Sequence, residues 1–178
     1  MEKDILKVLV TEEQIQTRIK EMGKEISEEY KDKDPVVLGV LKGVVMFYAD
    51  MMKHITVPCQ MDFMCLSSYR GGTSTGNMIV KQDMSVDVNG RHVLILEDIL
   101  DSGYTLSRIV EMLKERGPAS VKICTMLDKP SGRKEPLEAD YVCFTIPDGF
   151  VVGMGLDYQD YYRNLPFVGI LKEEVYTK

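Results

Sequence analysis

The sequence predicts an α/β fold in which a twisted, mainly parallel sheet is flanked by helices. Three nearly all-apolar runs have the composition of buried strands: VVLGVL (36–41), HVLILE (92–97) and SVKICTML (120–127). Helical patterns follow the first two runs, and strands that alternate with helices are typical of a parallel sheet covered on both faces. Because ligands of such sheets bind beyond the carboxyl ends of the strands, the site is expected in the loops that follow these runs.

Each element can be predicted in chain order. Thr11 and Gln14 form a capping-box pattern that begins a helix. The apolar residues that follow recur at helical spacing on one face: Ile15, Ile19, Met22, Ile26 and Tyr30. After the first strand we expect a helix from about residue 43 to about residue 54. After the second strand we expect a helix from about Tyr104 to Arg116, which Gly117 would end at its C′ position.

The segments outside these units are richer in turn residues. Two extended segments flank the loop RGGTSTGN (70–77), whose glycine, serine and threonine content predicts mobility. The C-terminal part of the chain is loop-rich, with many prolines and glycines. We therefore expect a single domain over residues 1–178, with a core at about 36–130 and a flexible flap loop at about 68–78. The N-terminal segment and residues from about 131 onward would form a small hood.

Composition limits the classes of partner. The formal net charge of −6 argues against a nucleic-acid-binding surface, which needs clustered lysine and arginine. A phosphate site must then be local, built from backbone N–H groups, a few cations and a metal. No apolar run approaches a membrane span, and the N-terminus lacks a secretory pattern, so we expect a cytoplasmic protein without membrane contact. The cysteines have no metal-site spacing and are interpreted as reduced core thiols: Cys59, Cys65, Cys124 and Cys143.

The stretch VLILEDILDSGYT (93–105) carries the most chemical information. An apolar strand leads through two carboxylates into the start of a helix, whose free N–H groups attract anions. Gly103 permits close backbone approach, and Ser102 and Thr105 add hydroxyl donors, so this turn predicts a monophosphate site. The neighbouring Glu97 and Asp98 would accept hydrogen bonds from sugar hydroxyls or hold magnesium.

A plainer interpretation is that Asp98 and Asp101 only end a strand and cap a helix. The complete thirteen-residue pattern favours a site, and it resembles the phosphoribosyl pyrophosphate (PRPP) signature of type I phosphoribosyltransferases. By this resemblance Glu97 and Asp98 serve the ribose hydroxyls and magnesium, and residues 101–105 hold the 5′-phosphate. The matching positions are Glu97, Asp98, Asp101, Ser102, Gly103 and Thr105. Tyr104 stands where some relatives carry lysine, which leaves the phosphate more dependent on backbone and hydroxyl donors.

Two short segments resemble the hypoxanthine-guanine branch of this family. Leu41, Lys42 and Gly43 match its pyrophosphate loop, in which the peptide before the lysine tends to be cis. In LDKP, Lys129 matches the lysine that donates to the exocyclic oxygen at C6 of the purine. An ammonium group can only donate a hydrogen bond, so it favours an oxo group over the amino group of adenine. The alternative is that both lysines are ordinary exposed residues.

The longest resemblance is IPDGFVVGMGLDYQDYYRNLPFVG (146–169). It implies that Phe150 stacks on the purine and that the backbone around Val151 reads the edge of the base. It also implies that Asp157, beside the base, coordinates a second magnesium and that Arg163 reaches pyrophosphate. In the alternative interpretation, Phe150 is a core residue and Asp157 and Arg163 form a surface pair.

Ser68 and Tyr69, before the glycine-rich loop, resemble the catalytic flap of the family. Closure of a flap would protect a sugar cation from capture by water. A flexible hairpin without this role is the alternative.

The resemblance implies an enzyme that joins a 6-oxopurine to the ribose of PRPP with Mg²⁺ as cofactor. Asp101 would be the catalytic residue, accepting the proton from N7 of the purine while Lys42 and Arg163 stabilise the departing pyrophosphate. Relatives are commonly oligomers, so a homodimer or homotetramer is expected. Two alternatives stay open: a xanthine- or guanine-preferring enzyme, and a PRPP-sensing regulator that binds RNA, against which the acidic composition counts.

Overall fold

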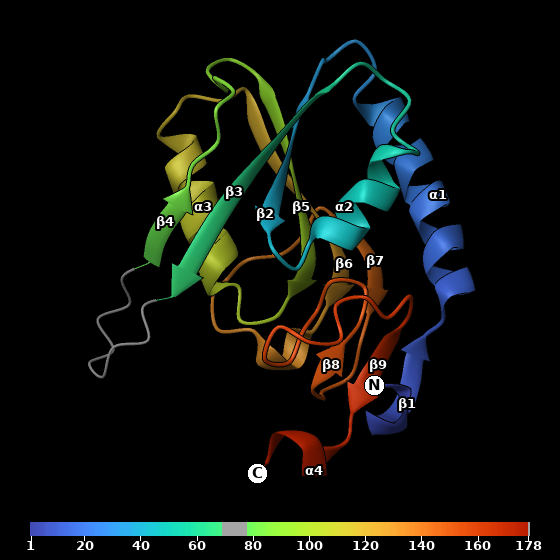
Figure 1. Cartoon of the computed structure of the whole chain (residues 1–178). Helices are drawn as coiled ribbons and strands as arrows, with labels where there is room; N and C mark the ends of the chain where they lie inside the picture. The colour runs from blue at the N-terminus through green and yellow to red at the C-terminus, as the bar shows by residue number, and fades with distance from the viewer. Residues whose placement is uncertain (69–77, 178) are drawn as a thin grey trace.

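The computed structural model of the chain describes residues 1–68 and 78–177. The strands of its central sheet are β2 (Val36–Leu41), β3 (Gln60–Ser68), β4 (Met78–Gln82), β5 (His92–Leu100), β6 (Ser120–Asp128) and β7 (Tyr141–Thr145). They lie in the order β4-β3-β2-β5-β6-β7 (Figure 1). Neighbours pair in parallel except β3 and β4, which are antiparallel. The prediction of a mainly parallel sheet is confirmed.

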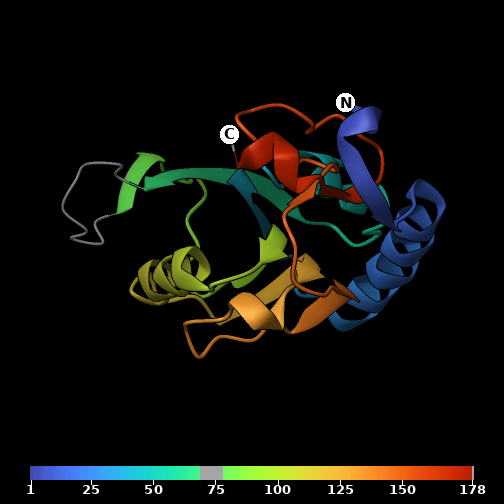
Figure 2. The same ribbon diagram turned by 90° about the horizontal axis from the view of Figure 1, so that it is seen from below.

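Helices cover both faces of this sheet, as Figure 2 shows. The helices are α1 (Glu12–Glu29), α2 (Val45–Met52) and α3 (Tyr104–Lys114). Side chains alternate along β5: Leu94 and Leu96 pack in the cluster that contains α1 and α2. Val93 and Ile95 pack in the cluster that contains α3. Because each face of β5 meets a helix over residues 93–96, this part of the strand carries only apolar side chains.

The helix signals in the sequence correspond to real caps. The Thr11 hydroxyl accepts a hydrogen bond from the Gln14 amide at 3.3 Å, and the Gln14 side chain accepts one from the Thr11 amide at 2.9 Å. The five apolar residues predicted to face the core are buried, each 1% exposed or less. Gly117 has a positive φ of 71°, and α3 ends at Lys114, two residues before the predicted end.

Strand β5 is longer than predicted, and this changes where its acidic residues lie. The sequence suggested a strand that ends at Glu97, but pairing with β6 continues to Leu100, opposite Asp128. Asp98 is therefore part of the strand, as Glu97 is, and not of the loop after it. The continued parallel pairing satisfies backbone groups that a loop would have to expose.

A second, three-stranded sheet lies beyond the carboxyl ends of the central strands (Figure 1). It consists of β1 (Ile5–Val10), β9 (Val168–Leu171) and β8 (Val151–Val152), and a short helix α4 (Glu173–Tyr176) follows it. We call these segments, together with the connection between β8 and β9, the hood. However, β7 falls within the predicted hood range and pairs with β6 instead, Tyr141 opposite Cys124. The boundary expected near residue 130 is thus corrected, since the central sheet continues past it.

Three further expectations concern the flap loop, the cysteines and membrane spans. Ser68 is the last residue of β3, whereas Tyr69 and the rest of the predicted flap loop through residue 77 lie outside the described residues. All four cysteines are free. Among residues 1–68 and 78–177, no helix has the length and apolar character needed to cross a bilayer.

Candidate active site

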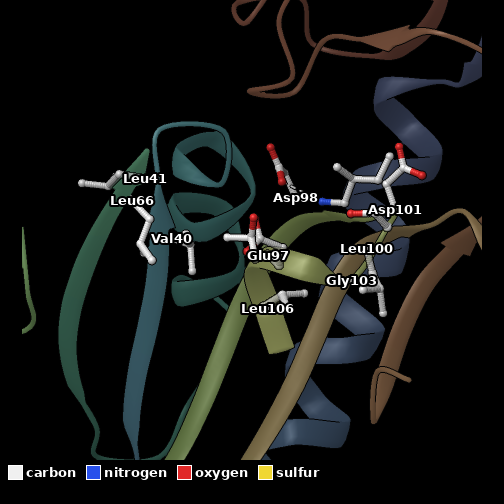
Figure 3. Close-up of a pocket in the computed structure, with 12 residues that line it drawn as sticks. Val40, Leu41, Leu66, Glu97, Asp98, Leu100, Asp101, Gly103 and Leu106 are labelled. Carbon is white, nitrogen blue, oxygen red and sulfur yellow. Dashed lines mark hydrogen bonds between the residues drawn. The ribbon is translucent and has the colours of Figure 1, made fainter. Parts of the chain in front are cut away.

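A cavity of about 290 Å³ opens at the carboxyl end of β5, next to the start of α3 (Figure 3). We call it the β5–α3 cavity. Of the residues predicted to bind ligand, its lining contains Leu41, Glu97, Asp98, Asp101, Ser102, Gly103 and Thr105. Tyr104 is not in this lining; its ring lies 5.7 Å from the Arg108 guanidinium carbon. The acidic residues and the turn after β5 therefore meet in one hollow, as the sequence predicted.

The turn that enters α3 depends on Gly103. This residue has a φ of 81° and is the N-cap of the helix, a conformation that favours glycine. A side chain at this position would also approach the Cβ of Glu135 to 3.3 Å. The helix thus starts at the cavity wall, where its amide groups and positive end favour an anion.

Arg133 holds this turn from behind and was not identified in the sequence. Its Nε donates to the carbonyl of Asp101 at 2.9 Å, and its Nη2 donates to the carbonyl of Leu100 at 3.2 Å. An ion pair with Asp128 fixes the guanidinium group in turn. Because Arg133 lies 32 residues from Asp101, no local sequence pattern could have revealed the contact.

The acidic pair on β5 is buried, with Glu97 8% and Asp98 9% exposed. Burial, together with the neighbouring Asp98, raises the pKa of Glu97 well above its ordinary value. Burial also raises the pKa of Asp98, although a side-chain hydrogen bond with Glu97 and, to a smaller extent, the charge of Arg163 oppose this effect. The Glu97 Oε2 atom has no hydrogen-bond partner within the described part of the chain. This end of β5 therefore holds more acceptor capacity than the protein itself satisfies.

The loop after β2 fits tightly against this pair. The peptide bond between Leu41 and Lys42 is cis, which confirms the prediction. A Cβ added to Gly43 would lie 1.7 Å from Asp98 Oδ2, and one added to Gly155 would lie 1.8 Å from the Gly43 carbonyl oxygen. The two glycines thus let the loop pass between β5 and the hood.

The predicted cations of the pyrophosphate site are paired with hood carboxylates. Lys42 Nζ lies 3.1 Å from Asp160 Oδ1. Arg163 Nη2 lies 2.9 Å from Asp157 Oδ1 and 2.8 Å from Asp160 Oδ1. Hydrogen bonds from Arg163 and Lys42 lower the pKa of Asp160, a residue that the sequence interpretation did not select. The Asp157–Arg163 pair is the arrangement that the alternative interpretation expected.

A smaller cavity of about 160 Å³ lies beside Phe150, and we call it the Phe150 cavity. Its lining joins predicted base-binding residues to others that were not predicted: Ile99, Asp101, Lys129, Gly149, Phe150, Val151 and Leu156. Ile99 and Asp101 also line the β5–α3 cavity, so the two hollows adjoin. Phe150 is 38% exposed, which excludes the alternative that it is a core residue.

An ion pair stands where the two cavities meet. Lys129 Nζ lies 2.9 Å from Asp101 Oδ2, and the lysine side chain is only 13% exposed. Gly132 makes room for the carboxylate, since a Cβ there would lie 1.6 Å from Asp101 Oδ1. Figure 3 shows Asp101 set apart from Glu97 and Asp98 along the end of β5. A hydrogen-bond donor and an acceptor are thus held side by side between the cavities.

The residues present suit a metal ion that is shared with a ligand. In the described ranges, no group of three or more His, Cys, Asp or Glu side chains could hold a metal alone. Mg²⁺ commonly binds through one or two carboxylates together with substrate phosphates and water. The unpartnered Glu97 Oε2 and the adjacent Asp98 offer such carboxylates, and Asp157, 32% exposed, offers a third on the hood side.

Comparison with known proteins agrees with this geometry. The profile of the phosphoribosyl transferase domain matches residues 9–159. A hypoxanthine-guanine phosphoribosyltransferase of Streptococcus pneumoniae is 53% identical over 178 residues, covering 99% of both chains. The crystal structure of a hypoxanthine phosphoribosyltransferase from Staphylococcus aureus has a TM-score of 0.96 at 48% identity and covers 100% of this chain and 97% of its own. The Trypanosoma cruzi enzyme in complex with the product IMP has a TM-score of 0.92 at 44% identity, with 98% of both chains covered.

Proposed function

The chain belongs to the phosphoribosyl transferase family, and we propose that it transfers the 5-phosphoribosyl group of PRPP to N9 of hypoxanthine and guanine. The products are IMP or GMP and pyrophosphate, and the role is purine salvage. The observation that carries this proposal is the Asp101–Lys129 pair, 2.9 Å apart, between a cavity suited to a sugar phosphate and one suited to an aromatic base.

This pair matches one edge of a 6-oxopurine. Lys129 donates to the oxygen at C6, and Asp101 accepts from the N–H at position 7. Adenine presents an amino group at C6, so the Lys129 ammonium would face another donor and lose its hydrogen bond. Phe150 and Ile99 border the same cavity and supply apolar contact to the two faces of the ring. Val151 contributes backbone at the edge of the base, and together these contacts select a flat oxo-bearing ring.

The β5–α3 cavity takes the ribose phosphate. The 5′-phosphate binds the amide groups at the start of α3 and the hydroxyls of Ser102 and Thr105. Glu97 and Asp98, on the strand before this turn, accept hydrogen bonds from the ribose hydroxyls. This role uses the Glu97 Oε2 atom, which has no hydrogen-bond partner among residues 1–68 and 78–177.

Mg²⁺ is the proposed cofactor, with Glu97, Asp98 and Asp157 as the residues that would hold it. When bound, the ion neutralises negative charge on the pyrophosphate group as it departs. Lys42 and Arg163 of the protein neutralise the same negative charge. Both cations must exchange their present carboxylate partners, Asp160 and Asp157, for the diphosphate.

The reaction then follows from these positions. The bond between C1′ and the pyrophosphate oxygen lengthens while Lys42 and Arg163 stabilise the leaving group, and positive charge develops on the ribose. N9 of the purine bonds to C1′, and Asp101 accepts the proton from N7. Ser68 and Tyr69, at the edge of the flap loop, are proposed to cover the site during this step.

The test is a spectrophotometric assay with PRPP and Mg²⁺ against hypoxanthine, guanine, xanthine and adenine in parallel. We expect turnover of hypoxanthine and guanine and none of adenine. Turnover of adenine alone would contradict the assignment of Lys129. Comparison of the rates with hypoxanthine, guanine and xanthine gives the preference among oxopurines.

We also propose that the enzyme works in the cytoplasm as a homodimer or homotetramer. Large apolar side chains are exposed on α2, β3 and β4, where a second copy would cover them: Val45, Met46, Met61, Ile79 and Val80. Light scattering of the purified protein measures the oligomeric state directly, and a monomer at assay concentration would contradict the proposed homodimer or homotetramer.

A further inference from the structure

Phe150, the residue proposed to stack on the purine, is not held by the protein core. The residue is 38% exposed, and the two rings that contact it, Tyr158 and Tyr176, belong to the hood. The Tyr176 ring stacks on it with the centroids 5.0 Å apart and an interplanar angle of 22°. The Tyr158 ring meets it edge-on at 5.6 Å and 90°. Two aromatic contacts therefore define the plane of Phe150.

Neither tyrosine borders the cavity that Phe150 faces. The described residues that line the Phe150 cavity include Lys129, Asp101 and Ile99, but not Tyr158 or Tyr176. Tyr176 thus contacts Phe150 away from the cavity. Phe150 therefore both contacts Tyr176 and borders the cavity, whereas Tyr176 does not border it.

The chain that carries Tyr176 is joined to Phe150 a second time, through the backbone. The Leu171 amide, at the end of β9, donates to the Phe150 carbonyl oxygen at 2.8 Å. The Lys172 amide donates to the Asp4 carbonyl at 2.9 Å, which connects the start of α4 to the N-terminal segment. Tyr176 therefore lies on a short helix whose start is fixed to both Phe150 and the N-terminal segment.

We infer that Tyr176 is a positioning residue for the base: its ring fixes the plane of Phe150 so that the opposite face of Phe150 receives the purine. This inference rests on the proposed function. The contact with Phe150 is made by the ring of Tyr176. The structure records no hydrogen bond of the Tyr176 hydroxyl within the described residues. A planar ring at position 176 should be required, and the hydroxyl should not.

The experiment compares Tyr176→Leu, which keeps apolar bulk without a ring, with Tyr176→Phe, which keeps the ring. Val175→Ala, on the same helix, is the matched control for weaker anchoring of α4. The KM values for hypoxanthine and for PRPP are measured for each protein, with thermal unfolding as a check of folding. Tyr176→Leu should raise the KM for hypoxanthine about three- to tenfold, the range for loss of one aromatic pair. Its KM for PRPP should stay within about twofold of wild type.

Tyr176→Phe and Val175→Ala should both behave like wild type. Equal KM values for hypoxanthine in the Leu and Phe variants would overturn the inference while leaving the proposed function intact. So would a rise that affects PRPP equally, because it would indicate general loosening of the hood. A wild-type protein that turns over no purine would overturn the proposed function itself, and this inference with it.

Discussion

Two glutamates at opposite ends of the central sheet, Glu29 and Glu97, have pKa values that are shifted in opposite directions. Glu29 ends α1 near the start of β6 and β7, where it accepts hydrogen bonds from Lys122 and Tyr141. The bond from Lys122, followed by that from Tyr141, lowers the pKa of Glu29. Glu97 lies near the end of β5, where burial and Asp98 raise its pKa, and its Oε2 has no partner among the described residues.

The difference separates a structural carboxylate, Glu29, from Glu97, for which we propose a role in ligand binding. A lowered pKa means that the folded state binds the charged form well, so Glu29 stabilises the protein above the ordinary glutamate pKa. That contribution is lost as the pH falls through the lowered value. A raised pKa means the reverse: the contribution of Glu97 is present below the ordinary pKa and is lost as the pH rises through the raised value. At neutral pH the active-site end therefore lowers the stability of the free protein.

The largest expected effect is on the turnover of a variant at Asp101, at the same end of the sheet as Glu97. Without this effect, the contrast between a structural end and a catalytic end of the sheet would fail. Asp101→Asn should lower kcat by about 10²–10⁴, because the variant cannot accept the purine proton. Binding of PRPP should be largely spared. The matched control is Asp148→Asn, which alters the other carboxylate near Lys129, 3.9 Å away and 83% exposed. Steady-state kinetics of both variants measure this, and near-normal turnover in Asp101→Asn would remove Asp101 from the role of base.

The next effect tests how tightly the loop after β2 is fitted to the acidic pair. Gly43→Ala adds a methyl group whose carbon would lie 1.7 Å from Asp98 Oδ2, so one of the two residues has to move. Overpacking of this kind should cost about 1–3 kcal/mol of unfolding free energy, measured by urea unfolding. In an Asp98→Ala background the obstructing atoms are gone, so the same substitution should cost less. Strictly additive costs would show that the two residues do not interfere.

The smallest expected effect is on the stability of a variant at Glu29, at the other end of the sheet. Glu29→Gln should lower the unfolding free energy by about 0.5–1 kcal/mol at neutral pH, a modest value because the Glu29 side chain is 35% exposed. The loss should disappear as the pH falls through the lowered pKa of Glu29, and kcat should not change. Glu25→Gln, at an exposed position of the same helix, is the control for urea unfolding at both pH values. A loss of activity in Glu29→Gln would contradict its structural assignment.

The parts of the fold that the sequence predicted are those governed by short-range rules. The capping box at Thr11 involves residues three apart, and the periodicity of α1 follows from one buried face. Strands β2 and β5 were recognisable because helices cover both of their faces. The end of β5 was predicted three residues too early, because pairing with β6 and not local composition determines where it stops.

The site shows the same division. The residues from Glu97 to Thr105 could be selected because one strand-turn-helix unit carries them. Arg133 and Asp160 could not, because their roles arise from contacts with Asp101 and Lys42 that tertiary packing alone creates. Tyr176 belongs with them, since nothing in its neighbourhood in the sequence points to Phe150.

The most direct test of the account is the thermal unfolding of wild type and Glu97→Gln at neutral pH, without ligand and with saturating PRPP and Mg²⁺. Without ligand the variant should melt higher, by about 2–4 °C for a gain on the order of 1 kcal/mol, because the variant no longer buries an acidic group whose pKa the fold raises. With PRPP and Mg²⁺ the wild type should gain more than the variant, because only the carboxylate serves the ligand. A variant that melts lower than wild type without ligand, or that gains as much with it, would contradict the claim that Glu97, whose Oε2 has no hydrogen-bond partner among the described residues, serves the substrate.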